Sequence, residues 1–175
     1  MAVSGLRNIL VTGASCPVGE QLVRALLDDS RVDRVLAVVG DDPDLFPVPK
    51  SDLLVVLQVD LVKSRRVHAL LFGPARDMAV DSIIHLATHR DATQEGARVH
   101  AFNVEAIRSI LQLAERHPTI SRVVVRSDAA VYQINNDLPA LIGEEHPLNL
   151  AGGAPQWVRD RVEADITTCT RMGIS

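Results

Sequence analysis

The stretch Asn8-Ile9-Leu10-Val11-Thr12-Gly13-Ala14-Ser15-Cys16-Pro17-Val18-Gly19 decides the fold of this chain. An apolar run ends in Thr-Gly, a loop of small residues follows, and Pro17 suits the first turn of a helix. Small residues let backbone N–H groups approach a phosphate, and the helix dipole favours negative charge there. The stretch therefore predicts a strand, a phosphate-sized turn and a helix. A dinucleotide-binding loop of this kind usually has a glycine in the middle, and Cys16 occupies that position here.

The composition indicates one globular domain with an aliphatic core. The chain has 175 residues, of which 47% are hydrophobic and 23% charged, so it is long enough for a sizeable core and is not of the disordered class. Aromatic residues make up only 3%, and an aliphatic core suits parallel strands covered by helices on both faces. We therefore expect residues 1–175 to form a single domain.

Charge, cysteine content and hydropathy exclude several partners. The formal net charge is -4 and no basic stripe stands out, so nucleic acid is not an expected partner. The two cysteines, Cys16 and Cys169, are too few for a disulfide framework or a zinc site of their own, which favours the cytoplasm and predicts no metal. No apolar run approaches the ~20 residues of a membrane span, so no membrane is expected as a partner.

Continuous apolar runs alternate with segments of helical spacing along the whole chain. The expected strands are 9–11, 35–39, 53–59, 83–87 and 123–125. The expected helices begin at Pro17, near Val67, at Ala97 and at Gln156. This alternation implies right-handed crossovers between parallel strands. The fold class is therefore α/β, a Rossmann-type doubly wound parallel sheet in three layers, in which ligands bind beyond the carboxyl ends of the strands.

Two of these helices carry more specific expectations. Gly73-Pro74 should end the second helix, because neither residue suits a helix interior. The last helix should run from Gln156 to Met172 and bury Val158, Val162 and Ile166.

Acidic residues follow the second and third strands. Asp41 and Asp42 come directly after the second strand, where an acid can bond the hydroxyls of an adenosine ribose and would repel a 2′-phosphate. Either acid could instead be a solvated turn residue beside Pro43. Asp60 follows the third strand and could contact a ligand or cap the next helix.

Five motifs occur in order along the chain. They are Thr12 to Gly19, Asp60-Leu61, His85-Leu86-Ala87, Asn103-Val104 and Ser127 to Gln133. Together they resemble the extended short-chain dehydrogenase/reductase family, the group of NAD-dependent epimerases and dehydratases. The resemblance runs from about Asn8 to the last residue. A lone glycine-rich loop is a weak signal, whereas five motifs at the right spacing are a specific one.

The resemblance implies a dinucleotide cofactor, NAD rather than NADP. It also implies a nucleotide-sugar-like substrate in the full-length protein, and a homodimer formed through the long helices. The cofactor-binding positions that it implies are Gly13, Ser15, Cys16, Pro17, Val18, Gly19, Asp41, Asp60, Leu61, Leu86, Ala87, Thr88 and Asn103.

The catalytic positions of the family depart from its pattern. The family uses a Tyr-x-x-x-Lys pair on the last helix, and these positions correspond to Trp157 and Arg161. Tryptophan offers only an N–H donor and arginine stays protonated, so neither can replace the proton-transferring tyrosine. Asp128 stands where the family has a serine, and Tyr132 has no lysine four residues later. We therefore expect no intact catalytic set.

Family members resembling this chain continue past a sixth strand into a C-terminal substrate lobe. Residues 172–175 resemble the approach to that strand, so we expect a sheet truncated before it, with the lobe absent, in a fragment of a longer protein; a truncated family member is the alternative. The leading functional hypothesis is an NAD-binding domain without oxidoreductase activity of its own. The alternative is a non-catalytic regulatory, scaffold or sensor module of a larger protein.

Four residues keep two interpretations each. Cys16 is a small residue filling a glycine position or a thiol activated by the helix N-terminus. His85 is expected to have its ring satisfied by backbone, with metal binding as the minor alternative. Asp128 either solvates its loop or serves as a general base, and Trp157 either packs or stacks on a ligand.

Overall fold

The computed structural model describes residues 7–171 except 90, 136 and 140. Its sheet is parallel throughout and follows the order β3-β2-β1-β4-β5. The strands are β1 (Arg7–Thr12), β2 (Val32–Val39), β3 (Leu54–Gln58), β4 (Ser82–His85) and β5 (Arg122–Val125). The predicted α/β Rossmann-type sheet is confirmed in all five strands.

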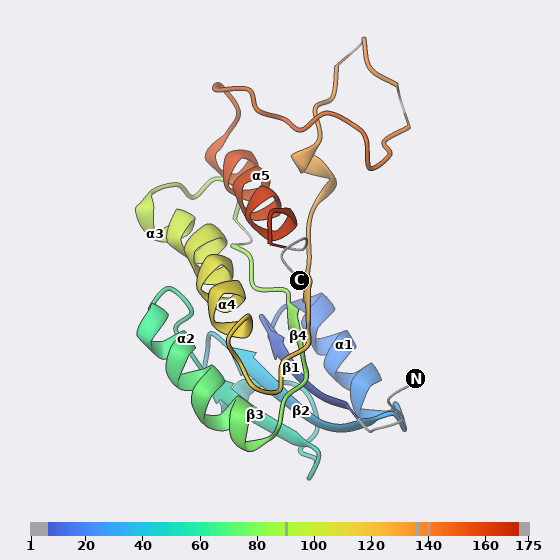
Figure 1. Ribbon diagram of the computed structural model, residues 1–175, viewed down its shortest axis with the longest axis vertical. Helices are drawn as coiled ribbons and strands as arrows, with labels where there is room; N and C mark the ends of the chain where they lie inside the picture. Colours follow the sequence, from blue (N-terminus) through green and yellow to red (C-terminus); the bar gives the residue numbers. More distant parts are fainter. Residues whose placement is uncertain (1–6, 90, 136, 140, 172–175) are drawn as a thin grey trace.

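Helices cover the two faces of this sheet unequally. The helices are α1 (Pro17–Leu27), α2 (Ser64–Leu70), α3 (Ala97–His100), α4 (Ala106–Ala114) and α5 (Gln156–Cys169). Figure 1 shows α2 and α4 on one side of the strands and α1 on the other. None of the helices within the described ranges is long and apolar enough to cross a lipid bilayer.

Alternation along β1 divides the core into two clusters. Leu10 packs with residues of α2 and α4, whereas Ile9 and Val11 pack with Val23 of α1. Successive strand residues point to opposite faces, so a parallel sheet buried on both sides needs an unbroken apolar run. The apolar run that opens the sequence therefore anchors both layers.

Two helical segments contain wide turns that the sequence pattern did not predict. The predicted break at Gly73-Pro74 is confirmed, because Gly73 has non-helical backbone angles (φ -109°, ψ -108°) and the chain kinks there. The part that was not predicted is a π-helical turn, η2 (Leu71–Ala75), which spans this kink after α2. The helix expected from Ala97 onward is likewise interrupted by a π-helical turn, η3 (Ala101–Glu105), between α3 and α4. Such single wide turns insert into helices without ending them.

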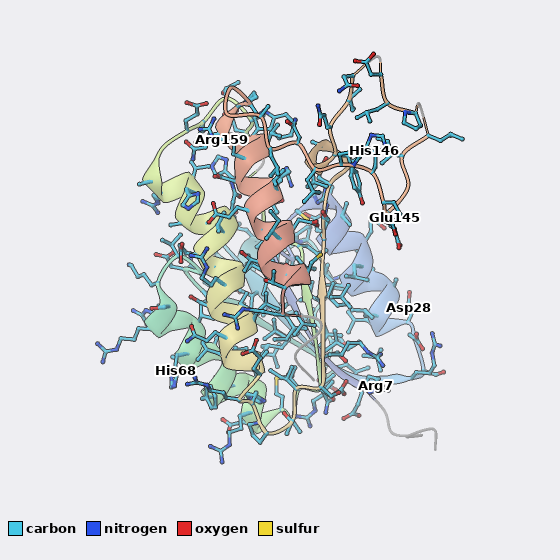
Figure 2. The ribbon with its side chains drawn as sticks, turned by 45° about the horizontal axis from the view of Figure 1, so that its top comes forward. Arg7, Asp28, His68, Glu145, His146 and Arg159 are labelled. Atoms are coloured by element: carbon cyan, nitrogen blue, oxygen red, sulfur yellow. The ribbon has the colours of Figure 1, made fainter. Side chains whose placement is uncertain are left out.

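The segment between β5 and α5 is largely irregular, as expected. It contains a short 3-10 turn, η4 (Ala129–Val131), and a single antiparallel bridge between Tyr132 and Leu148 among the described residues. The ring nitrogen Nε2 of His146 lies 2.8 Å from the carbonyl oxygen of Gln133, and this contact links the same two parts of the segment as the bridge. Figure 2 shows His146 and Glu145 on this excursion, well away from Arg7 at the start of β1.

Helix α5 buries the predicted face in its first half only. Val158 and Val162 pack with Val131 and Ala154, as a small third cluster. Ile166 is 39% exposed, so its predicted burial is wrong. The irregular segment covers only the first half of α5, and the helix turns a polar residue, Asp160, inward instead. The predicted end at Met172 lies outside the described residues.

Candidate functional site

The glycines of the turn after β1 are fixed by contacts within the protein. Gly13 has φ +67°, and a Cβ added there would lie 2.6 Å from the backbone nitrogen of Ala87. A Cβ on Gly19 would lie 2.6 Å from the carbonyl oxygens of Gly13 and Ala14. The turn therefore packs directly against the segment after β4, and its first and last glycines are needed to close it. Pro17 and Val18 lie exposed on its outer side.

Cys16 serves as the N-cap of α1. Its side chain is buried, and Sγ accepts a hydrogen bond from the backbone N–H of Gly19 at 3.2 Å. Capping by a side-chain acceptor is the usual role of serine or threonine at this position. The structure thus gives Cys16 a local role inside the turn, with its sulfur directed into the protein.

His85 and Thr12 face each other at the ends of two paired strands. The Nδ1 atom of His85 lies 2.6 Å from the Oγ1 atom of Thr12, and both residues are buried. Burial lowers the pKa of His85 to about 4 because the charged imidazolium would lose its hydration. The ring is therefore satisfied by a side-chain hydroxyl, and the expectation of a backbone partner is wrong.

The two acids after β2, Asp41 and Asp42, differ in their hydrogen bonds. Oδ1 of Asp42 accepts from the N–H of Asp44 and caps the short turn η1 (Pro43–Leu45). Asp41 is exposed and has no hydrogen bond or ion pair within the part of the chain that the structure describes. Of the two acids, Asp41 is therefore the one available for a ligand.

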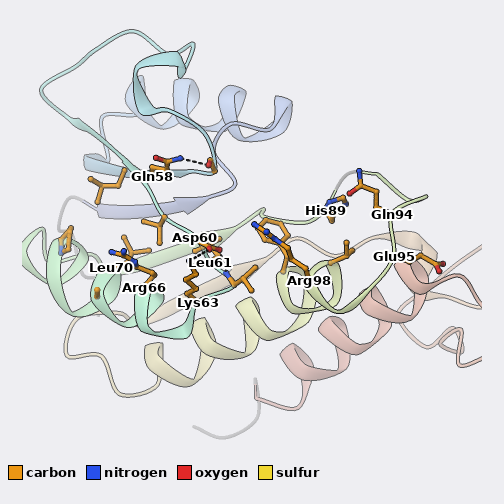
Figure 3. Close-up of a pocket in the computed structure, with 18 residues that line it drawn as sticks. Gln58, Asp60, Leu61, Lys63, Arg66, Leu70, His89, Gln94, Glu95 and Arg98 are labelled. Carbon is orange, nitrogen blue, oxygen red and sulfur yellow. Dashed lines mark hydrogen bonds and ion pairs between the residues drawn. The ribbon is translucent and has the colours of Figure 1, made fainter.

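A cavity of about 1070 Å³ opens beyond β3, beside α2 and the segment that leads into α3 (Figure 3). Asp60 and Leu61 line it, together with Gly40 from the end of β2. Oδ1 of Asp60 accepts from the N–H of Val62, and Lys63 is the N-cap of α2. Asp60 therefore caps a turn and does not cap the helix. The turn after β1, Asp41 and residues 86–88 do not line this cavity.

A second cavity, of about 30 Å³, lies between the segments that follow β4 and β5 and helix α5. Thr88, Asn103, Asp128 and Arg161 are among the residues that line it. Nε of Arg161 lies 3.6 Å from Oδ2 of Asp128, too far for a hydrogen bond, and this buried nitrogen has no hydrogen-bond partner among the described residues. The guanidinium also lies 6.0 Å from the centre of the Trp157 ring. Asp128, Trp157 and Arg161, the three residues expected to depart from the family pattern, therefore form one cluster.

Asp128 and Trp157 each have a structural contact that the sequence left open. Oδ1 of Asp128 accepts from the N–H of Ala130 and caps η4. Trp157 is partly buried against the third cluster of Val131, Ala154, Val158 and Val162. Both observations agree with the structural interpretations of these side chains. No group of three or more histidine, cysteine or acidic residues that could hold a metal ion is found among the described residues.

Asp160 is the residue that sequence reasoning missed. Its side chain is buried, at 2% exposure. Oδ1 of Asp160 lies 2.8 Å from Nδ1 of His100, and Oδ2 accepts a hydrogen bond of 3.1 Å from Nδ2 of Asn103. Oδ1 of Asn103 accepts in turn from the backbone N–H of His89 at 2.8 Å. Asn103 is thus engaged on both ends of its amide. No local signal in the sequence could have found it, because His100 and Asn103 lie 60 and 57 residues away along the chain.

Comparison with known proteins shows which protein family the chain matches. A sequence model described as "NAD dependent epimerase/dehydratase family" matches residues 9–151. "Uncharacterized protein Rv0501" of Mycobacterium tuberculosis is 25% identical over 139 residues, which are 78% of this chain and 36% of the relative. "Peramine synthetase ppzA" of Metarhizium majus is 27% identical over 146 residues, 70% of this chain and 5% of the relative.

Solved structures share the fold at low sequence identity. A dTDP-glucose 4,6-dehydratase from Bacillus anthracis in complex with NAD superposes with a TM-score of 0.75 at 18% identity, over 96% of this chain and 51% of that one. The epimerase Mth375 from Methanothermobacter thermautotrophicus gives a TM-score of 0.79 at 15% identity, over 98% and 49%.

The chain spans about a third of the length of the mycobacterial relatives and about half of these solved structures. The matched region nevertheless runs from β1 through the irregular segment that precedes α5. With the family model matched over residues 9–151 and all five strands in their expected order, the chain belongs to the NAD-dependent epimerase/dehydratase family.

Proposed function

We propose that this chain is the NAD-binding domain of an epimerase/dehydratase-type protein. The observation that carries the proposal is the position of the turn at 12–19. It lies at the carboxyl end of β1, between β2 and β4, where the order of the strands reverses. Ligands of doubly wound sheets bind in the crevice at this reversal point. The small residues of the turn and the start of the eleven-residue helix α1 suit a pyrophosphate there.

The surrounding residues fit the rest of the cofactor. The backbone around Ser15, Pro17 and Val18 would hold the pyrophosphate, with Cys16 shaping the turn from inside. Asp41 is exposed at the end of β2 and suits the ribose hydroxyls. Asp60 and Leu61 offer the adenine a polar edge and an apolar surface in the large cavity. When bound, NAD would supply a hydride acceptor.

The nicotinamide end of the cofactor would lie toward the second cavity. Leu86, Ala87 and Thr88 follow β4 on that side, and Thr88 lines the cavity itself. Burial of Leu86 and Ala87 would exclude water from this end. Asn103 is engaged with His89 and Asp160, so it would shape this end and would not move a proton.

We further propose that this chain does not carry out hydride transfer by itself. Trp157, Arg161 and Asp128 fill the place where a tyrosine and a lysine would move a proton. Arg161 stays protonated, and its charge is opposed by Asp128 at 3.6 Å. The residues of this chain can therefore bind and orient a cofactor, while the group that would exchange the proton is missing.

Calorimetric titration tests cofactor binding. NAD should bind, and Asp41→Asn should weaken NAD about three- to tenfold because a hydrogen bond to a charged acceptor is lost. The affinity for NADP should fall less in Asp41→Asn, because the acid that repels the 2′-phosphate of NADP is gone. Asp44→Asn is the matched control, since Asp44 is an equally exposed acid of the same loop whose carboxylate pairs only weakly, with Lys50. Absence of any heat with millimolar NAD would refute the proposal.

A second candidate function is a non-catalytic regulatory or sensor module within a larger protein. The observation that favours it is the ion pair between Arg161 and Asp128, in which these two charged groups beside the second cavity are already engaged with each other. The NAD titration distinguishes the two, because only the first requires cofactor binding. Assays of hydride transfer with sugar nucleotides and NAD test the lack of catalysis that both candidates share. Hydride transfer that is abolished by Asp128→Asn or Arg161→Gln would establish an enzyme and would contradict the claim of lost catalysis.

A further inference from the structure

The segment that leads into α3 forms one wall of the large cavity. His89, Gln94 and Glu95 line the cavity from this segment, as Figure 3 shows. Residues 91–98 are exposed throughout, so apolar burial does not hold them against the rest of the protein. The position of this wall is therefore set by hydrogen bonds.

Two amide side chains hold the wall at two points of its backbone. Oδ1 of Asn103 accepts a hydrogen bond from the backbone N–H of His89 at 2.8 Å. Oε1 of Gln156 accepts from the backbone N–H of Gly96 at 2.8 Å, and Nε2 of Gln156 donates to the carbonyl oxygen of Gly96 at 3.0 Å. Gly96 is the N-cap of α3 and has φ +113°, which L side chains rarely adopt. Each amide can hold the wall only while its oxygen faces the backbone N–H.

Asp160 sets the orientation of both amides. Its Oδ2 atom accepts from Nδ2 of Asn103 at 3.1 Å and from Nε2 of Gln156 at 3.4 Å. An ionised carboxylate can only accept hydrogen bonds, so each amide must turn its NH2 group toward Asp160. The oxygen of each amide is then left for the backbone N–H on its other side. A flipped amide would place acceptor against acceptor at Asp160 and donor against donor at the wall.

We propose that Asp160 is a positioning residue for the large cavity. Acting through Asn103 and Gln156, this one buried carboxylate holds His89 and Gly96 in place. Asp160 and Asn103 also line the second cavity, so the same group is shared by both cavities. Its effect on NAD rests on the proposed function, which places the two ends of the cofactor at these two cavities.

Amide hydrogen exchange, followed residue by residue by NMR, tests the positioning. Asp160→Leu roughly keeps the size of the side chain and removes both acceptors, so exchange of the His89 and Gly96 N–H groups should accelerate about five- to tenfold. Asp160→Asn should keep exchange slow, because its amide oxygen can face both neighbouring amides. Its NH2 group then faces Nδ1 of His100, which a neutral imidazole offers as an acceptor.

Val162→Ala is the matched control. Val162 is a buried residue of the same helix that packs in the third cluster, so its truncation loosens α5 without removing a partner of either amide. Exchange at His89 and Gly96 should then stay close to that of the unmodified protein. Gln156→Leu keeps the test valid if Asp160→Leu does not fold, because Gln156 is only partly buried. It should accelerate exchange at Gly96 and leave His89 slow.

Three results would overturn the positioning role. They are unchanged exchange in both leucine variants, no recovery in Asp160→Asn, and an equal acceleration in Val162→Ala. The last of these would show that Asp160 only docks α5.

Titration of NAD on the same samples separates this role from the proposed function. NAD affinity should fall about three- to tenfold in Asp160→Leu and recover in Asp160→Asn, and equal affinities in these two variants would overturn the role in the cavity. If NAD does not bind the unmodified protein while exchange changes as expected, the proposed function fails alone. If NAD binds and exchange does not respond, the positioning role fails alone.

Discussion

At the scale of single residues, the turn after β1 depends on the lack of a side chain at Gly13. Gly13 combines a positive φ with contact against the backbone of Ala87, so both its conformation and its missing side chain are required. Gly40, at the end of the neighbouring strand, has nothing within 4 Å of the position that a Cβ would take. The two glycines lie beyond adjacent strands and differ in what surrounds them.

Gly13→Ala should therefore destabilise the protein by about 2–4 kcal/mol, because the added methyl strains the backbone and forces two segments apart. Gly40→Ala should change the free energy of unfolding by less than about 0.5 kcal/mol. Urea unfolding followed by circular dichroism measures both. Equal effects of the two substitutions would show that the close approach to Ala87 does not constrain the turn.

His85 should make stability depend on pH. Its pKa is about 4 in the folded protein and near 6.5 in the unfolded chain, so the folded state favours the neutral ring. The stabilisation is then complete above pH 6.5 and is lost as the pH falls toward 4. The loss should reach about 3 kcal/mol. In His85→Asn the unfolding free energy should fall by about 3 kcal/mol less than in the unmodified protein between pH 6.5 and 4, and parallel profiles would contradict the assignment.

At the scale of elements, α5 is held by a polar network as much as by its apolar face. Asp160 of α5 contacts His100 of α3 and Asn103 of η3, so one buried carboxylate joins three elements. Buried acids are rare unless they are paired and hydrogen-bonded. The network therefore fixes the position of α5 beside the two segments that precede α4.

Asp160→Ala should destabilise the protein by about 2–4 kcal/mol, because it leaves the amide of Asn103 and the ring of His100 without their partner. Glu163→Gln is the comparison, since Glu163 lies one turn further on the same helix, pairs with Arg108 at the surface and makes only a long contact of 4.0 Å with Nε2 of His100. Its effect should stay below about 0.5 kcal/mol. Thermal unfolding of both variants measures the difference, and a smaller loss in Asp160→Ala than in Glu163→Gln would contradict the role of the network.

Much of this arrangement could be predicted from the sequence, and the remainder could not for physical reasons. Continuous apolar runs identified all five strands, because strands buried on both faces need them. The wide turns η2 and η3 could not be predicted, since one extra residue in a helix hardly alters its apolar period. Asp160 could not be placed as buried, because its partner Asn103 lies 57 residues away along the chain. In the candidate site, Asp60 and Leu61 line a cavity beyond β3, and their assignment to a cofactor stays a prediction, whereas the side chain of Cys16 is buried inside the turn.

At the scale of the whole molecule, the two faces of the sheet are covered to different extents. Val123 of β5 packs into the cluster beneath α2 and α4, whereas Val124, its neighbour on the opposite face, is 48% exposed. Helix α1 lies over β2 and β1 and does not extend to this edge. Strand β5 therefore ends the sheet with an open apolar position.

Val124→Lys should reduce self-association of the protein at high concentration, because a charge on an edge strand discourages pairing and apolar contact. Its unfolding free energy should change little, since no core contact is lost. Val123→Lys is the matched comparison and should instead destabilise strongly, because it buries a charge. Light scattering and urea unfolding measure the two quantities, and unchanged scattering by Val124→Lys would contradict the prediction.

The contact between Gly13 and Ala87 has a consequence for the entropy of binding. The ends of β1 and β4 are joined by backbone packing, so the base of the crevice has few conformations left to lose. A ligand that settles on this base finds its donors already in position, and little ordering opposes its affinity. The segment from residue 91 to 98, by contrast, is exposed throughout and carries Arg98 toward the large cavity. It is nevertheless held to α5 by two hydrogen bonds between the backbone of Gly96 and the Gln156 side chain, so this side of the crevice is also partly fixed before a ligand binds.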